Sequence, residues 1–310
     1  MMNSNPAKGP VGVRHVILIT GAATGIGALA ATSLAAAGHL VYASMGDPDG
    51  RNAEKARALV QSAKQLPGEV RIVSLDVLSE ESATRAVTEI ESATDGLTVV
   101  IHNAAHLFFG ITEAFDAREL IQAFDVNCAG AHRVNRAALP KMRERNQGLL
   151  LWVGSGVTRA VPPFLAPYTT AKAAFDALCD ATAWDVAIYG IETTMLMPGV
   201  FTECTAHFEK AATPKDAATG VAYCRVQPFI ESNLVDTQRM FPNGVSADPQ
   251  IVADEIVRIV DLPPGARPRR AIADGSDYGT EIVNGAAEQL RLRLAKRMNI
   301  TGLLAQNDRW

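Results

Sequence analysis

The sequence predicts an α/β protein built on a parallel sheet, and two observations lead to this prediction. From His15 onward, short runs of β-branched residues alternate with longer, Ala-rich amphipathic segments. Such alternation is typical of βαβ units, whose right-handed crossovers place helices on both faces of a sheet. A glycine-rich stretch separates the first run from the first amphipathic segment, as expected where a buried strand turns into a helix. We therefore expect about seven strands flanked by helices.

The predicted elements follow one another from residue 15 to residue 298. Residues 15–20 are apolar, β-branched and bounded by glycine, which suits a strand buried on both faces. Residues 26–37 are rich in Ala and Leu and end at Gly38, as a helix does. The same patterns predict further strands near 40–44, 70–75, 97–102, 148–153, 192–197 and 269–273. Further helices are predicted near 52–65, 80–93, 117–138, 168–189, 249–261 and 280–298.

One long segment interrupts the alternation of predicted strands and helices. Residues 1–13 read as a loose polar tail and residues 14–310 as a single domain, with an insertion at about 203–247. A connection of this length is usually a functional lid or carries helices of its own. We expect it to cover a hydrophobic or bulky substrate, or simply to pack on the body of the domain. The apolar residues expected there are Phe208, Tyr223, Pro228, Phe229, Met240 and Phe241, with Phe108, Phe109, Pro162, Pro163 and Phe164 from neighbouring loops.

Composition excludes several classes of function. The chain has 310 residues, of which 48% are hydrophobic and 20% charged, and its net charge of −4 gives no electrostatic case for binding nucleic acid or an anionic membrane. No long apolar run or signal-peptide core is present, so a cytoplasmic location is expected. The four cysteines lack metal-ligand spacing, and His102 and His106 stand in a strand end and loop, so no metal site is predicted.

The glycine-rich stretch, residues 20–27, has the spacing G-x-x-x-G-x-G. Gly21 permits a tight turn, Gly25 allows close approach of phosphates, and Gly27 lets the helix pack on the strand. Such a turn presents backbone N–H groups and the positive end of a helix to a diphosphate. The alternative is a glycine-rich turn without function.

A second motif joins Tyr168 and Lys172, thirteen residues after Ser155. A spacing of four places the phenol and the ammonium on one face of a helix. We expect the ammonium to favour the phenolate and to lower the pKa of Tyr168 towards a range useful for acid–base catalysis. Both motifs, like residues 103–105 and 198–202, follow the carboxyl end of a predicted strand, where open α/β sheets bind ligands.

Together these residues resemble the short-chain dehydrogenase/reductase (SDR) family over most of the chain. The motifs concerned are the TGAATGIG turn (20–27), His102-Asn103-Ala104-Ala105, Asp125-Val126-Asn127, Ser155 with Tyr168 and Lys172, and Pro198-Gly199. The second motif departs from the family's NNAG, with His for the first Asn and Ala for the Gly. The resemblance implies a Rossmann-type doubly wound sheet in the order 3-2-1-4-5-6-7.

The resemblance also implies an activity. The chain would be an NAD(P)(H)-dependent oxidoreductase that interconverts a ketone or aldehyde and an alcohol by hydride transfer. Tyr168 would be the general acid and base, and Ser155 would hold the substrate oxygen. Lys172 would favour the phenolate form of Tyr168 and hold the nicotinamide ribose. Asn127 would hold a water that links Lys172 to solvent.

The resemblance further assigns cofactor-binding residues: Gly21, Ala23, Thr24, Gly25, Ile26, Gly27, Ser44, Asp76, Val77, Asn103, Ala104, Tyr168, Lys172, Pro198, Gly199 and Thr202. Ser44 stands where NAD-dependent members carry an acid, which argues against strict use of NAD. Met45 and Gly46 supply no cation for a 2′-phosphate, but Arg51 could reach it. NADP(H) is therefore favoured slightly over NAD(H).

Two other functions remain open at the level of sequence. One is a sugar-nucleotide epimerase or dehydratase, and the other is a non-catalytic NAD(P)-sensing protein. By analogy with the family we also expect a homodimer or homotetramer, formed through helices 117–138 and 168–189.

Overall fold

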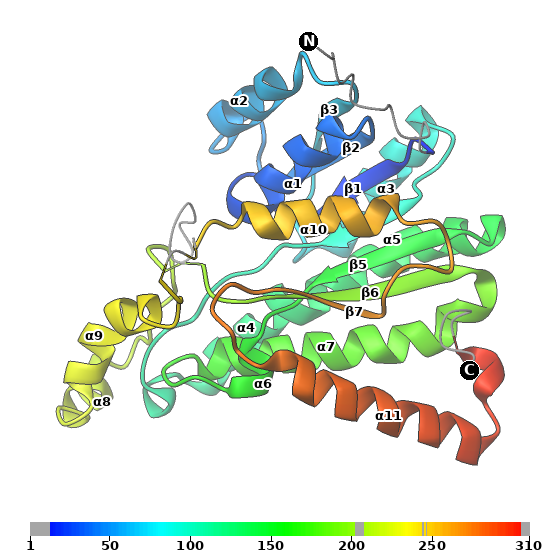
Figure 1. Cartoon of the computed structure of the whole chain (residues 1–310). Helices are drawn as coiled ribbons and strands as arrows, with labels where there is room; N and C mark the ends of the chain where they lie inside the picture. The colour runs from blue at the N-terminus through cyan, green and yellow to red at the C-terminus, as the bar shows by residue number, and fades with distance from the viewer. Residues whose placement is uncertain (1–12, 202–207, 244, 246, 305–310) are drawn as a thin grey trace, which may run out of the picture.

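The computed structural model describes residues 13–201, 208–243, 245 and 247–304. Its centre is one sheet of seven parallel strands in the order β3-β2-β1-β4-β5-β6-β7 (Figure 1). The predicted fold class and strand order are thus confirmed. The strands are β1 (Val16–Ile19), β2 (Leu40–Met45), β3 (Glu69–Ser74), β4 (Val99–His102), β5 (Gly148–Val153), β6 (Ile191–Pro198) and β7 (Arg270–Ala273).

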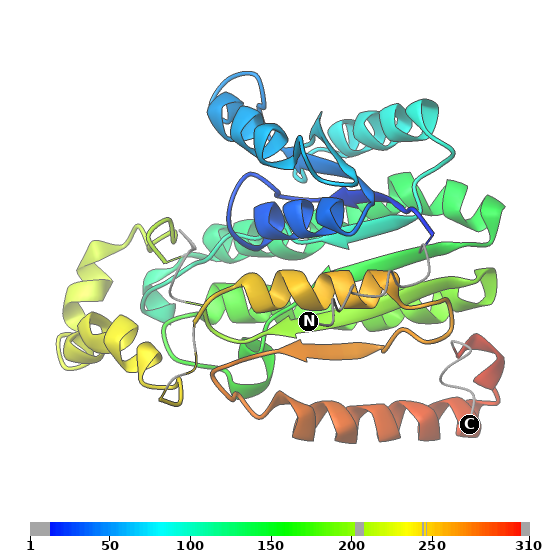
Figure 2. The ribbon, with the colours of Figure 1, turned by 45° about the horizontal axis from the view of Figure 1, so that its top comes forward.

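Helices cover both faces of the sheet. The helices are α1 (Gly25–Ala36), α2 (Ala53–Ala63), α3 (Glu80–Ala93), α4 (Ala117–Phe124), α5 (Gly130–Arg145), α6 (Val157–Ala160), α7 (Ala166–Val186), α8 (Ala217–Ala222), α9 (Gln227–Gln238), α10 (Gln250–Asp261) and α11 (Thr280–Met298). Helices α1, α2 and α10 bury Leu34, Leu59 and Ile256 against one face, while α3, α5 and α7 pack on the other (Figure 2). Short 3-10 turns are Thr112–Ala114, Ala187–Tyr189 and Thr301–Leu303.

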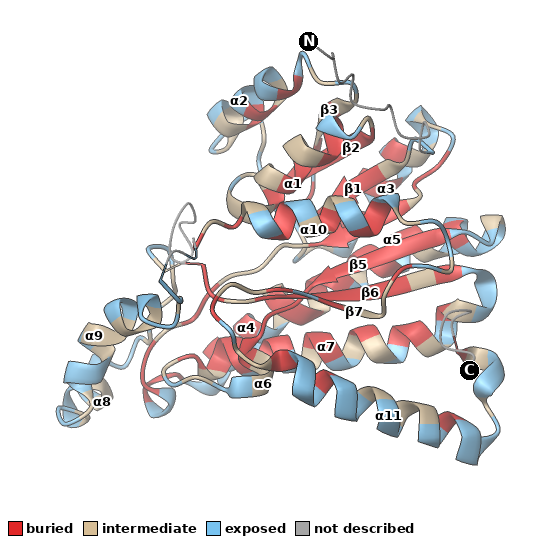
Figure 3. Cartoon of the chain, viewed as in Figure 1, coloured by how far each residue is buried: buried red, intermediate tan, exposed pale blue. Residues whose placement is uncertain are grey.

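The central strands are enclosed on both sides. Every residue of β2, β4 and β5 is buried, which explains why their sequences are continuous apolar runs rather than alternating ones (Figure 3). Trp152 of β5 is the largest fully buried side chain. This rigid sheet fixes the positions of the loops that follow its carboxyl ends.

The helix predicted over 117–138 is interrupted. A π-helical turn, Asp125–Ala129, separates α4 from α5. The amide of Asn127 donates to the carbonyl of Ala123 (2.9 Å) and to that of His106 (3.0 Å), and its oxygen accepts from the N–H of His106 (2.9 Å). The bonds to His106 reach outside the helix, and with the bond to Ala123 they hold the widened turn, a feature frequent at functional sites.

The segment after β6 forms helices α8 and α9, which project from the body of the domain (Figure 1). Much of their apolar surface is exposed, including Val221, Phe229 and Val235. Residues 203–207, where the predicted lid begins, and nearly all of the predicted tail lie outside the described residues. Among the described helices, none has the length and apolar character needed to cross a membrane.

Candidate active site

The glycine-rich turn packs tightly against the end of β4. Gly21 and Gly25 have φ of +68° and +57°, a region open to glycine. A Cβ on Gly21 would lie 2.8 Å from Cα of Ala104, and one on Gly27 would lie 2.5 Å from the Asn103 amide nitrogen. Gly21 is therefore required by both conformation and space, Gly25 by its conformation and Gly27 by space.

Hydrogen bonds of Asn103 and Thr20 hold the glycine-rich turn against the end of β4. The Thr20 hydroxyl accepts from the N–H groups of Asn103 (2.9 Å) and Ala104 (3.0 Å). The Asn103 amide donates to the carbonyls of Thr20 (3.0 Å) and Gly21 (3.1 Å). Helix α1 begins in this turn, and its N-cap, Thr24, makes no side-chain cap. The first N–H groups of α1 thus face the pocket and suit an anionic group.

His102, which departs from the family's motif, does not belong to the pocket. Its Nε2 is 2.8 Å from the Asn135 amide oxygen and its ring lies 4.5 Å from that of Trp152. Complete burial lowers the pKa of His102 to about 4, so the ring is neutral at pH 7. The substitution is accommodated inside the core and leaves the neighbouring Asn103 in place.

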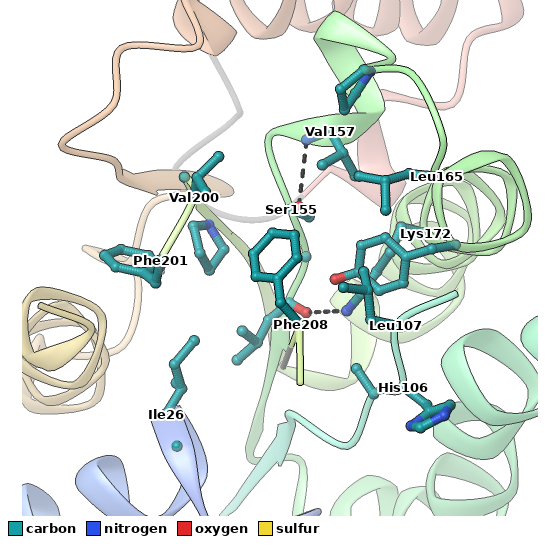
Figure 4. Close-up of a pocket in the computed structure, with 18 of the residues that line it drawn as sticks. Ile26, His106, Leu107, Ser155, Val157, Leu165, Lys172, Val200, Phe201 and Phe208 are labelled. Carbon is teal, nitrogen blue, oxygen red and sulfur yellow. Dashed lines mark hydrogen bonds between the residues drawn. The ribbon is translucent and has the colours of Figure 1, made fainter. Parts of the chain in front are cut away.

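Ser155, Tyr168 and Lys172 line one cavity at the carboxyl end of β5. Figure 4 shows Ser155 and Lys172 there. All three are buried, with 8%, 7% and 2% of their surfaces exposed. The Ser155 and Tyr168 hydroxyls are hydrogen-bonded. The Lys172 ammonium donates to the carbonyl of Val153 (2.8 Å) and lies 5.9 Å from the centre of the Tyr168 ring. The predicted catalytic group is therefore assembled, with Asn127 in the π-helical turn nearby.

The electrostatics of this group differ from the sequence-based expectation. Burial raises the pKa of Tyr168, an effect that Ser155 partly offsets and that Tyr278 adds to. Burial lowers the pKa of Lys172 to about 8. Lys172 therefore does not lower the pKa of Tyr168 in these surroundings, because desolvation dominates both groups. At neutral pH Tyr168 is a protonated phenol and Lys172 is mostly an ammonium.

These residues face a cavity of about 580 Å³ between the sheet edge and the projecting segment. Apolar side chains enclose the reacting groups, as Figure 4 shows for Val157, Leu165 and Phe208. Pro162, Pro163, Phe208 and Met240 line the cavity as predicted. Their convergence gives the pocket an apolar wall.

Other predicted aromatic residues do not reach the cavity. Phe108 is a core residue, 1% exposed, and Phe109 packs edge-on against Phe164 with ring centres 6.0 Å apart. Tyr223 hydrogen-bonds Glu113 (2.5 Å), and Phe229 is 65% exposed. The predicted aromatic pocket is thus only partly correct, because several of these rings pack on loops or face solvent.

The predicted cofactor residues divide into three groups. Those that line the cavity are Gly21, Thr24, Gly25, Ile26, Asn103, Ala104, Tyr168, Lys172, Pro198 and Gly199. Those away from it are Ala23, Gly27, Ser44, Asp76 and Val77. Thr202 lies outside the described residues.

Ser44 requires a correction. Its side chain is completely buried within β2, and its hydroxyl has no hydrogen-bond partner among the described residues. It faces the core because it precedes the end of the strand, and so it does not face a bound ribose. The residues just beyond are better placed: a Cβ on Gly46 would lie 3.1 Å from a terminal nitrogen of Arg51. The cation predicted to reach the carboxyl end of β2 is thus close to it.

Several cavity residues escaped the sequence analysis. Helix α9 contributes Asn233, Asp236 and Thr237. Their spacing of three and four residues is a helical face, a signal that was available in the sequence. Tyr278, beyond β7, also lines the cavity, and no motif marks it.

Comparisons with known proteins agree with this geometry. The sequence pattern of the short chain dehydrogenase family matches residues 15–215. An uncharacterized oxidoreductase of Bacillus subtilis, YusZ, is 26% identical over 251 residues, covering 79% of this chain and 84% of that protein. A short-chain dehydrogenase from Streptomyces avermitilis has a similar fold, with a TM-score of 0.70, 24% identity, and coverage of 93% and 98% of the two chains.

An alcohol dehydrogenase from the archaeon Thermococcus sibiricus, solved with 5-hydroxy-NADP, also shares the fold, with a TM-score of 0.65 and 23% identity over 84% of this chain and 96% of that one. The match of the family pattern spans well over half of the sequence and includes the glycine turn and the Ser155, Tyr168 and Lys172 group. The chain therefore belongs to the short-chain dehydrogenase family, a family of oxidoreductases.

Proposed function

We propose that this protein transfers a hydride between a nicotinamide cofactor and a ketone or aldehyde, with the corresponding alcohol as the other substrate. The observation that carries this proposal is the convergence of Ser155, Tyr168 and Lys172 on the cavity that the glycine-rich turn also lines. The cofactor would supply or accept the hydride, and the protein would bind it, orient the substrate and move one proton.

The residues of the turn fit a dinucleotide. The uncapped N-terminus of α1 offers N–H groups for a diphosphate, and Gly25, which lines the cavity, has no side chain to obstruct its approach. Asn103, Ala104, Pro198 and Gly199 would enclose the nicotinamide end, and Lys172 would bind the ribose. By the family resemblance, Thr202 would also contact the cofactor.

The protonated phenol of Tyr168 is placed to donate to the developing alkoxide during reduction. The Ser155 hydroxyl, hydrogen-bonded to Tyr168, would hold the same oxygen within reach of the proton. By the family resemblance, Asn127 would connect Lys172 to solvent through water. The apolar walls suit a hydrophobic or bulky substrate.

The cofactor preferred in this proposal is NADP(H). Arg51 lies beside Gly46 at the carboxyl end of β2, where the 2′-phosphate of the adenosine ribose would bind. Asp76 and Val77 would flank the adenine. A homodimer or homotetramer remains part of the proposal, and the exposed Ile121 and Phe124 of α4 support contacts there.

Fluorescence titration with NADPH and NADH, followed by an activity screen on bulky ketones, tests the proposal. We expect saturable binding, tighter for NADPH, and oxidation of NADPH dependent on a ketone. Binding without turnover across a broad panel would instead favour a cofactor sensor, and failure to bind either nucleotide would contradict the proposal.

A further inference from the structure

The loop between β7 and α11 is an organised structure. The carboxylate of Asp274 accepts hydrogen bonds from the N–H (2.7 Å) and hydroxyl (2.6 Å) of Ser276 and from the N–H of Tyr278 (2.8 Å). Asp277 and Gly279, on either side of Tyr278, both have left-handed backbone angles, with φ of 54° and 66°. A left-handed residue other than glycine is uncommon, and here the carboxylate bonds around it hold it in place.

The same loop is attached to the end of β6. The N–H of Gly199 donates to the carbonyl of Ala273 (3.1 Å), and the N–H of Val200 donates to the Ser276 hydroxyl (3.3 Å). A Cβ on Gly199 would lie only 1.8 Å from a carboxylate oxygen of Asp274. Tyr278 is therefore held in a fixed relation to the Pro198-Gly199 segment of the pocket.

This arrangement brings the Tyr278 ring beside the reacting groups. A Cβ on Gly156, the residue after Ser155, would lie 3.1 Å from the ring of Tyr278. Tyr278 packs on the cluster that contains Tyr168, Val157 and Leu165, and it lines the same cavity. Because Gly156 has no side chain, the ring of Tyr278 can occupy this space.

The hydroxyl of Tyr278 is available for a ligand in the part of the chain that the structure describes. Among the described residues it has no hydrogen-bond partner. Burial and the nearby Asp274 raise the pKa of Tyr278 to about 12, so the phenol keeps its proton and remains a donor. A polar group in an apolar wall discriminates strongly between ligands. A ligand without a matching polar group leaves the protein's group without a hydrogen-bond partner.

We propose that Tyr278 contacts the substrate and selects ketones or alcohols that carry a second oxygen, a hydroxyl or carbonyl, apart from the reacting one. This inference rests on the proposed function and adds a substrate class to it. The reacting oxygen binds Ser155 and Tyr168, and the second oxygen accepts a hydrogen bond from Tyr278.

The test compares matched substrates in wild-type protein and the Tyr278→Phe variant. The substrates are bicyclic ketones with and without a hydroxyl group, whose position on the rings is varied. In the wild type we expect a higher kcat/KM for at least one hydroxylated ketone than for its plain analogue. Tyr278→Phe keeps the ring on Gly156. It should lower the ratio of kcat/KM for the hydroxylated ketone to kcat/KM for the plain ketone about fivefold, as loss of a hydrogen bond of about 1 kcal/mol predicts.

Tyr189→Phe is the matched control, because Tyr189 is exposed and packs on Arg143 away from the cavity. This variant should keep the wild-type ratio. If Tyr278→Phe also keeps it, or if the wild type never prefers a hydroxylated ketone, the inference is wrong while the proposed function stands. A protein that reduces no ketone, hydroxylated or plain, contradicts the proposed function and this inference together.

Discussion

Lys172 is a buried ammonium with one backbone acceptor, and its burial destabilises the charged form. The carbonyl of Val153 is the partner, at 2.8 Å, and the Phe175 ring lies 4.7 Å from the nitrogen. A pKa lowered from 10.5 to about 8 corresponds to about 3 kcal/mol of unfavourable desolvation. Natural active sites commonly retain a destabilised charged side chain of this kind, because the chemistry requires it.

Lys172→Met should therefore raise stability while removing activity. At pH 7 we expect the free energy of unfolding to rise by on the order of 1 kcal/mol, the desolvation relieved less the lost hydrogen bond. Because the folded pKa is about 8, the wild-type lysine becomes neutral above that pH while the unfolded one stays charged up to 10.5. The advantage of the variant should thus shrink between pH 8 and pH 10.5 in denaturant titrations; a constant difference would contradict this account.

Arg51 is the residue expected to decide the choice of cofactor. Its guanidinium lies beside Gly46, and its own N–H binds Asp47 (2.9 Å). Arg51→Gln removes the charge and should weaken NADPH binding by about tenfold or more, because one charge-assisted hydrogen bond contributes about 1.5–3 kcal/mol. NADH binding should stay the same, as measured by fluorescence titration of both nucleotides. Equal weakening of both would show that Arg51 does not contact a 2′-phosphate.

At the scale of elements, the sequence predicted the sheet more accurately than the helices and loops around the site. Central strands are continuous apolar runs, and their positions follow from burial on both faces. The π-helical turn at Asp125–Ala129 could not be predicted, because it depends on bonds between Asn127 and His106, which belong to different elements. The orientation of Ser44 was missed because it depends on where β2 ends.

The π-helical turn offers an element-scale prediction. Asn127→Ala removes three hydrogen bonds and leaves the partly buried backbone groups of His106 without this partner. We expect a loss of about 2–4 kcal/mol in the free energy of unfolding, together with loss of activity. Asn135→Ala, in the next helix, is a useful comparison because its partner His102 lies outside the cavity. It should lower stability while keeping most of the activity of the folded protein.

For the molecule as a whole, one buried and one half-buried histidine make the stability depend on acid pH. Burial lowers the pKa of His102 and of His15 to about 4 each. The unfolded chain binds protons at these sites below about pH 6.5, where the folded protein does not, so stability falls as the pH drops from 6.5 to 4. His102, which is completely buried, contributes about 2 kcal/mol of this loss by pH 5. His15 is partly exposed and contributes less, because solvent screens its charge.

His102→Asn should therefore reduce the fall in the free energy of unfolding at acid pH. The absolute stability at pH 7 will also change, so the quantity to compare is the loss between pH 7 and pH 5 in denaturant titrations. It should be about 2 kcal/mol smaller in the variant. His132→Asn, at an exposed position of α5, provides the control and should keep the wild-type slope. An unaltered slope in His102→Asn would mean that His102 titrates normally.

The central claim is that Tyr168 transfers the proton in a hydride-transfer reaction. Tyr168→Phe keeps the ring in its buried position and removes only the hydroxyl that Ser155 binds. The decisive measurement is the single-turnover rate of NADPH oxidation by a bulky ketone in wild type and variant, with NADPH affinity measured in parallel. We predict a rate lower by about 10²–10⁴-fold at nearly unchanged affinity for NADPH. A variant that retains near-normal turnover would contradict the account.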